Sequence, residues 1–123
     1  LVSREQIVAL AERLPCPLLV DEAYVDFAPF SCVDLTAKIP NLMVSRTLSK
    51  SYALAGLRFG YLVAHPEVIA VLRKVKDSYN TDALSIAGAT AAIADQAWLR
   101  ENVAKCNATR DRLTQELRAL GFT

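Results

Sequence analysis

The sequence predicts an α/β fold that is part of a mostly parallel sheet with flanking helices. Short, almost wholly apolar runs occur three times in the first half of the chain, as in strands packed beneath helices. Helical periodicity precedes the first run and follows the third, which gives the order helix, strand, strand, strand, helix. Three strands make a narrow sheet, and the chain begins at Leu1 in mid-pattern. We therefore expect a fragment of a longer protein.

The first helix and strand are predicted from local signals. Ser3 begins a helical pattern and Gln6 completes a capping box, while Pro15 and Pro17 end the helix. Residues 18–20 (LLV) then form a continuous apolar run, which is typical of a strand covered on both faces.

Two further strands are predicted after an irregular stretch. Residues 25–41 contain prolines and one predicted helical turn near 33–38. Residues 42–44 (LMV) form the second apolar run. A hydroxyl-rich segment, 45–52, separates it from the third, residues 59–64.

The second half of the chain is predicted to be helical. Pro66 is placed to begin a helix, because proline suits the first helical turn. Residues 83–95 form a second helix of small residues, and 97–120 form a third that stops at Gly121. This last helix carries an apolar stripe, and we expect its Cys106 to lie in the core.

Composition and charge exclude several classes of protein. Hydrophobic residues make up 53% of the 123-residue chain, which excludes disorder throughout. The net charge of +1 supplies no basic excess for nucleic-acid or anionic-membrane binding. The longest apolar or small-residue run, 84–94, is too short to span a bilayer, and residues 1–5 lack the apolar core of a signal peptide.

The cysteines and the histidine predict a cytoplasmic protein without a metal site. Cys16, Cys32 and Cys106 are odd in number and lack Cys-x-x-Cys spacing, which disfavours a disulfide framework and a cysteine zinc site. His65 is the single histidine and cannot form a histidine cluster. A reducing compartment fits this pattern.

Two polar clusters follow two of the predicted strands. Residues 21–24 (DEAY) follow the first strand, and 47–50 (TLSK) follow the second. Ligands of open α/β sheets bind beyond the carboxyl ends of parallel strands. If the two strands are parallel, the clusters lie at one edge of the sheet.

The second cluster has the composition of a phosphate site beside a reactive amine. Thr47 and Ser49 flank Lys50, and Arg58 follows eight residues later. Hydroxyls and a guanidinium donate hydrogen bonds to anionic oxygens, and a lysine of lowered pKa can form a Schiff base. We expect Gly56 to supply the tight turn toward this site. The alternative is a polar loop with a solvated lysine.

The first cluster is open to two interpretations. Asp21 could face a protonated ring nitrogen of a bound heterocycle, or could be a helix cap or surface ion pair. Tyr24 could donate its phenol to a ligand oxygen, or be a half-buried aromatic. Glu22 is expected on the opposite face of the strand as a salt-bridge residue.

Together, the two clusters resemble the pyridoxal-phosphate (PLP) site of the fold-type I aminotransferases. Residues 21–27 (DEAYVDF) resemble the segment whose aspartate meets the pyridine nitrogen and whose tyrosine meets the phenolic oxygen. Residues 45–60 (SRTLSKSYALAGLRFG) are similar to the Schiff-base lysine segment, most closely to that of the histidinol-phosphate aminotransferase branch. The resemblance covers essentially the whole chain.

The resemblance implies a set of site residues. The implied catalytic residues, which also bind the cofactor, are Lys50, Asp21 and Tyr24. The implied phosphate ligands are Thr47, Ser49 and Arg58. Lys50 would hold the aldehyde of pyridoxal 5'-phosphate as a Schiff base and then serve as general base. The implied substrates are histidinol phosphate and 2-oxoglutarate.

The resemblance also implies a domain division and an assembly. Residues 1–78 would be the C-terminal part of the PLP-binding large domain, and 79–123 a helical segment leading to the small domain. The full-length protein would be a homodimer, and this piece alone is expected to be inactive. Three alternatives stay open, namely threonine-phosphate decarboxylase or another enzyme of the fold, an aminotransferase-like regulator domain, and a structural remnant. The joint presence of both clusters disfavours the remnant.

Overall fold

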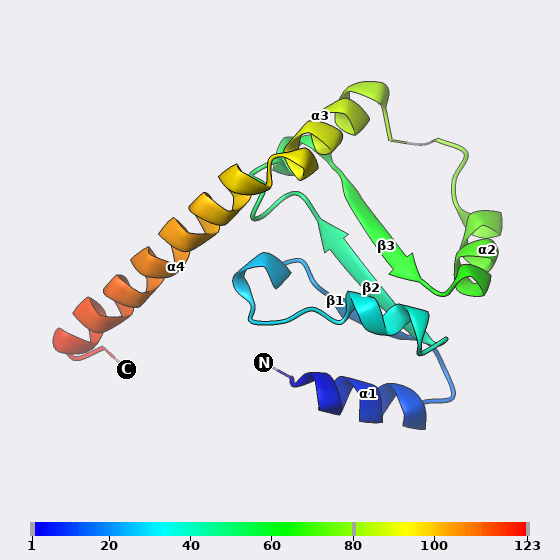
Figure 1. The fold of residues 1–123 in the computed structure, drawn as a ribbon, viewed down its shortest axis with the longest axis horizontal. Helices are drawn as coiled ribbons and strands as arrows, with labels where there is room; N and C mark the ends of the chain where they lie inside the picture. Colours follow the sequence, from blue (N-terminus) through cyan, green and yellow to red (C-terminus); the bar gives the residue numbers. More distant parts are fainter. Residues whose placement is uncertain (1, 80, 123) are drawn as a thin grey trace.

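The computed structural model describes residues 2–79 and 81–122 (Figure 1). Its α-helices and strands are α1 (Arg4–Arg13), β1 (Leu18–Asp21), β2 (Leu42–Thr47), β3 (Gly60–Ala64), α2 (Pro66–Val75), α3 (Ala83–Ala94) and α4 (Gln96–Ala119). Short 3₁₀ helices lie between them at η1 (Val25–Phe27), η2 (Val33–Ala37) and η3 (Ala55–Leu57). The predicted α/β class and order of elements are confirmed.

The three strands form a mixed sheet in the order β1-β2-β3. β1 and β2 are parallel, as expected, and Asp21 lies beside Ser45. β3 instead runs antiparallel to β2, with Thr47 beside Gly60. The pairing changes because residues 48–59 return the chain directly to its neighbour, without the helical crossover that a parallel strand requires.

The core lies on one face of this sheet. It is formed by Ile7 of α1, Cys32, and Leu42 and Val44 of β2, the last two with no exposed surface. On the opposite face, Leu19 of β1 is 51% exposed. The prediction that β1 is covered on both faces is therefore wrong for this chain, because α1 and η2 both pack on the same side.

The helices begin where their capping signals stand. Ser3 and Gln6 form the predicted capping box of α1, and Pro66 occupies the first turn of α2. Asp82 caps α3 by accepting a hydrogen bond from the backbone N–H of Ser85. None of the helices within the described ranges is both long enough and apolar enough to cross a membrane.

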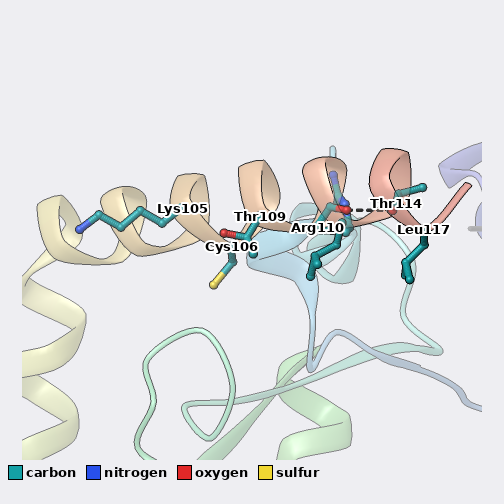
Figure 2. A pocket seen from close by; sticks show the side chains of 7 residues that line it. Lys105, Cys106, Thr109, Arg110, Thr114 and Leu117 are labelled. Carbon is teal, nitrogen blue, oxygen red and sulfur yellow. Dashed lines mark hydrogen bonds between the residues drawn. The ribbon is translucent and has the colours of Figure 1, made fainter. Parts of the chain in front are cut away.

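α4 extends away from the sheet (Figure 1), and only its first turns pack. Leu99 is buried, whereas residues 108–120 are exposed. Figure 2 shows Cys106 and Leu117 on the same side of this helix, lining a shallow hollow. Cys106 is exposed, so the prediction that it lies in the core is wrong. The apolar stripe exists, but its distal half has no element of the described chain to pack against.

Candidate active site

The polar clusters meet at one edge of the sheet. Asp21 ends β1 and Thr47 ends β2, and the two strands are parallel, so both residues lie at the carboxyl edge. Because β3 is antiparallel, its first residue, Gly60, lies beside Thr47 at the same edge. Arg58 comes just before β3 and is brought to this edge as well.

Asp21 is held by one carboxylate oxygen. Its Oδ1 accepts hydrogen bonds from the backbone N–H of Ala23, at 3.0 Å, and from the hydroxyl of Ser45, at 3.2 Å. Its Oδ2 has no hydrogen-bond partner in the described part of the chain, and the residue is exposed. The carboxylate is thus oriented while one oxygen stays available to a ligand donor.

Lys50 lies over the ring of Tyr24. Its Nζ is 5.3 Å from the ring centroid, within cation–π range. The loop carrying Lys50 is anchored by Leu48, which is 1% exposed and whose carbonyl accepts a hydrogen bond from the N–H of Leu54 at 3.0 Å. The structure therefore brings together the amine and the phenol from two segments of the predicted site.

The two predicted phosphate hydroxyls are bonded to each other. The Thr47 hydroxyl donates to Oγ of Ser49 at 3.0 Å and accepts from the Ser49 N–H at 3.1 Å. Arg58 lies at the other end of the same loop, and its guanidinium donates to the carbonyl of Ala55 at 3.0 Å. Among the described residues, Arg58 forms that bond and none to the hydroxyl pair.

The turn geometry of this loop differs from the prediction. The sequence predicts that Gly56 supplies the tight turn, but the left-handed residues of this loop are Ala53, with φ of 55°, and Arg58, with φ of 52°. A non-glycine residue in this region costs roughly 1–2 kcal/mol. Such strain clusters at functional sites, and here it occurs on both sides of η3, within the loop that carries Lys50.

A buried ion pair lies directly behind the site. Glu22 is 7% exposed, and its carboxylate accepts hydrogen bonds from Nε and Nη2 of Arg46 at 3.0 and 2.9 Å. The Ser31 hydroxyl and the Cys32 N–H also donate to Glu22. Burial alone would lower the pKa of Arg46, but hydrogen bonds with Tyr61 and Glu22 outweigh it and raise that pKa. Glu22 is thus the salt-bridge residue that strand alternation predicts.

One contact at the site was missed by the sequence reasoning. Ser51, which is buried, donates a hydrogen bond to Oδ2 of Asp26. The two residues are 25 positions apart and come from different loops, so no local pattern pairs them. The sequence offers one signal for this contact, which is that Ser51 directly follows Lys50 and Asp26 lies two residues after Tyr24.

The whole chain, residues 1–123, matches the family model of aminotransferase class I and II. The chain belongs to this family. It is 62% identical over 122 residues to a histidinol-phosphate aminotransferase of Rhodopirellula baltica, covering 99% of this chain and 34% of that protein. It is 52% identical over 121 residues to a histidinol-phosphate aminotransferase of Geotalea uraniireducens, covering 98% and 35%. The chain thus spans about a third of the length of these relatives.

Solved structures of aminotransferases share the fold. The histidinol-phosphate aminotransferase of Sinorhizobium meliloti, solved in complex with pyridoxal-5'-phosphate, superposes with a TM-score of 0.81 at 35% identity. That match covers 89% of this chain and 31% of that structure. The histidinol-phosphate aminotransferase of Clostridium acetobutylicum gives a TM-score of 0.87 at 23% identity, covering 99% and 38%, and supports the fold alone.

Proposed function

We propose that the protein carrying this chain is a PLP-dependent aminotransferase of histidine biosynthesis. It exchanges an amino group between histidinol phosphate and 2-oxoglutarate, giving imidazole acetol phosphate and glutamate. The observation that carries the proposal is the meeting of Lys50, Tyr24 and Asp21 at one sheet edge. The 62% identity to a histidinol-phosphate aminotransferase supports the choice of substrates.

The residues at this edge fit pyridoxal 5'-phosphate by their chemistry. Asp21 offers a carboxylate oxygen that has no hydrogen-bond partner among residues 2–79 and 81–122, and Tyr24 offers a phenol on an exposed side chain. Lys50 offers an exposed primary amine beside that phenol. An amine, a phenol and a carboxylate are the groups that would hold an aldehyde, a phenolic oxygen and a ring nitrogen.

The phosphate would be held by hydroxyl and guanidinium donors of one loop. We assign this role to Thr47, Ser49 and Arg58. The hydroxyl pair already lies within hydrogen-bonding distance, and Arg58 is exposed at the same edge. Binding would require the guanidinium to exchange its bond with Ala55 for an anionic oxygen, which is favourable because charge-assisted bonds are stronger.

The chemistry divides among three side chains. When bound, the cofactor supplies an electron sink that stabilises negative charge at the substrate's α-carbon. The Asp21 carboxylate would keep a proton on the ring nitrogen, and the Tyr24 hydroxyl would donate a hydrogen bond to the phenolic oxygen. The Lys50 amine would hold the cofactor aldehyde between turnovers and, once released from it, would be the base that moves the α-carbon proton.

We further propose that residues 1–78 are the C-terminal part of the cofactor-binding domain, and that 79–123 lead to a smaller domain. The support is the contrast between the packed sheet and the exposed distal half of α4 (Figure 1). The full-length protein would be a cytoplasmic homodimer, and the 123-residue chain alone would be inactive. Sedimentation of the full-length protein tests the dimer, and turnover by the isolated chain would contradict the predicted inactivity.

The binding proposal is tested by covalent labelling. The protein is incubated with pyridoxal phosphate and reduced with borohydride, and the modified residue is mapped by mass spectrometry. The expected result is modification at Lys50 that is lost in Lys50→Ala and kept in the matched control Lys38→Ala. Labelling spread evenly over the five lysines, at 38, 50, 74, 76 and 105, would refute an organised site.

The reaction proposal is tested by a paired product assay. The full-length protein is given histidinol phosphate and 2-oxoglutarate, and glutamate formation is measured. A parallel assay follows carbon dioxide release from threonine phosphate. Glutamate without carbon dioxide is expected, and the reverse outcome would replace transamination by decarboxylation.

A further inference from the structure

The segments that carry Tyr24 and Lys50 are joined by a side-chain hydrogen bond beside the site. Ser51 donates to Oδ2 of Asp26, and Ser51 is 7% exposed, so water does not compete freely for its hydroxyl. Ser51 follows Lys50 directly, and Asp26 lies two residues after Tyr24, at the centre of η1. The bond therefore connects the neighbours of two proposed catalytic residues.

Other contacts hold the two loops without joining one to the other. η1 packs against α4, and the Gln96 amide of α4 donates to the Tyr52 hydroxyl at 3.3 Å. The Ser85 hydroxyl donates to the Leu57 carbonyl of the Lys50 loop at 3.0 Å.

Glu22 and Arg46 join the chain at the end of β1 to β2, and the Glu22 N–H donates to the Ser45 carbonyl at 2.9 Å. These contacts set the register of the strands. Beyond them, the Lys50 loop closes on its own backbone through Leu48, which orders the loop without orienting it toward Tyr24.

Lys50 itself contributes little to its own placement. The side chain is exposed, and its amine makes a cation–π approach to the Tyr24 ring, 5.3 Å from the ring centroid. An exposed cation–π contact is worth only about 0.5–1 kcal/mol, too little to fix a flexible lysine. A hydrogen bond to a carboxylate is stronger than one between neutral groups, and the partly buried bond from Ser51 to Asp26 acts on the residue next to Lys50.

We propose that Asp26 and Ser51 are positioning residues that hold the Lys50 amine against the phenol of Tyr24. Neither residue touches the reacting atoms. Each acts through its neighbour, Asp26 by fixing η1 behind Tyr24 and Ser51 by fixing the backbone that carries Lys50. This inference rests on the proposed cofactor role of Lys50. The experiment below gives different results if the positioning role fails and if the cofactor role fails.

The test compares Ser51→Ala and Asp26→Asn with wild type in the full-length protein. The readouts are the Kd for pyridoxal phosphate, its pH dependence, and the share of borohydride-trapped label at Lys50. Loss of a bond to a charged group predicts a Kd about tenfold or more higher. It also predicts a smaller share of label at Lys50. Ser51→Thr, which keeps the hydroxyl, should have the wild-type Kd and the wild-type share of label at Lys50.

A matched control separates positioning from general destabilisation. Thr36 is also buried, and its hydroxyl donates to the Val33 carbonyl at 2.8 Å, a bond that lies wholly within η2. Thr36→Val removes one buried hydroxyl and should lower thermal stability while leaving the Kd and the label share unchanged. If Thr36→Val changes them as much as Ser51→Ala does, the positioning role is refuted.

The pair is coupled, so the double variant is informative. Ser51→Ala combined with Asp26→Asn should weaken cofactor binding by much less than the product of the single effects. Independent effects would overturn the inference, as would wild-type affinity in both single variants. Absence of selective Lys50 labelling in wild type would instead overturn the proposed function, and the inference would fall with it.

Discussion

Replacement of Glu22 by glutamine should destabilise the protein more than any exposed charge substitution. The side chain of Glu22 is 6% exposed and that of its partner, Arg46, is 23% exposed. Removing one member of a buried ion pair leaves the other charged and desolvated, at a cost of roughly 3–5 kcal/mol. Arg46 keeps partial access to water, which places the expected loss near the lower limit, at about 3 kcal/mol.

The Glu22→Gln variant removes the negative charge of the side chain while keeping its size and shape. Its amide oxygen can still accept from the Cys32 N–H or the Ser31 hydroxyl, so those donors need not become unpaired. The matched control is Asp34→Asn, which breaks the ion pair between Asp34 and Arg4, a pair more exposed to solvent. Exposed pairs contribute little, because water screens them.

Urea unfolding followed by circular dichroism measures the difference. With an m-value of about 1.5 kcal/mol/M, a loss of about 3 kcal/mol lowers the midpoint by roughly 2 M. Arg46→Met should show a comparable loss, and the double variant Glu22→Gln/Arg46→Met should lose clearly less than the sum. Equal midpoints for Glu22→Gln and Asp34→Asn, or strictly additive losses, would show that the buried pair is not a coupled unit.

Three further predictions concern the core, a helix cap and the phosphate ligands. Leu42→Ala should lower the free energy of unfolding by roughly 2–5 kcal/mol, while the exposed Leu84→Ala leaves it nearly unchanged in the same urea titration. The hydroxyl of Ser85 lowers the pKa of Asp82 below 3.8, so the stability lost in Asp82→Asn should be present above that pH. It should disappear as the pH falls through the lowered pKa, a change that unfolding curves at several pH values would follow. Arg58→Ala should raise the Kd for pyridoxal phosphate about tenfold or more in a binding titration, and an unchanged Kd would remove Arg58 from the phosphate ligands.

The elements of this fold that could be predicted are those whose causes are local. The capping box of Ser3 and Gln6 and the first-turn position of Pro66 act within one helical turn. Asp21 could be placed at the end of β1 because the apolar run 18–20 stops abruptly before it. The run 42–44 predicted the start of β2, but the strand continues through the polar residues 45–47 and ends at Thr47 itself. The convergence of the two ends followed from a single assumption, that β1 and β2 are parallel, and the sheet bears this out.

The features that could not be predicted depend on what an element packs against. Periodicity identified the apolar stripe of α4, but only the tertiary arrangement decides that Leu99 is buried and Cys106 is exposed. Leu19 is a second example. Its apolar side chain predicts burial, but no helix of the described residues covers its face of the sheet. A bond between loops, such as that from Ser51 to Asp26, needs two long-range placements at once.

The direction of β3 has a consequence for the chemistry of the site. Had β3 been parallel to β2, its first residues would lie at the opposite edge of the sheet, and Arg58 with them. The antiparallel return keeps both ends of the loop at one edge, where the Leu48 N–H donates to the Phe59 carbonyl at 3.2 Å. A loop closed at its base can tolerate strained residues, because the pairing of the strands on either side stabilises it. The left-handed conformation of Arg58 is therefore compatible with a stable sheet, at a position in the same loop as Lys50.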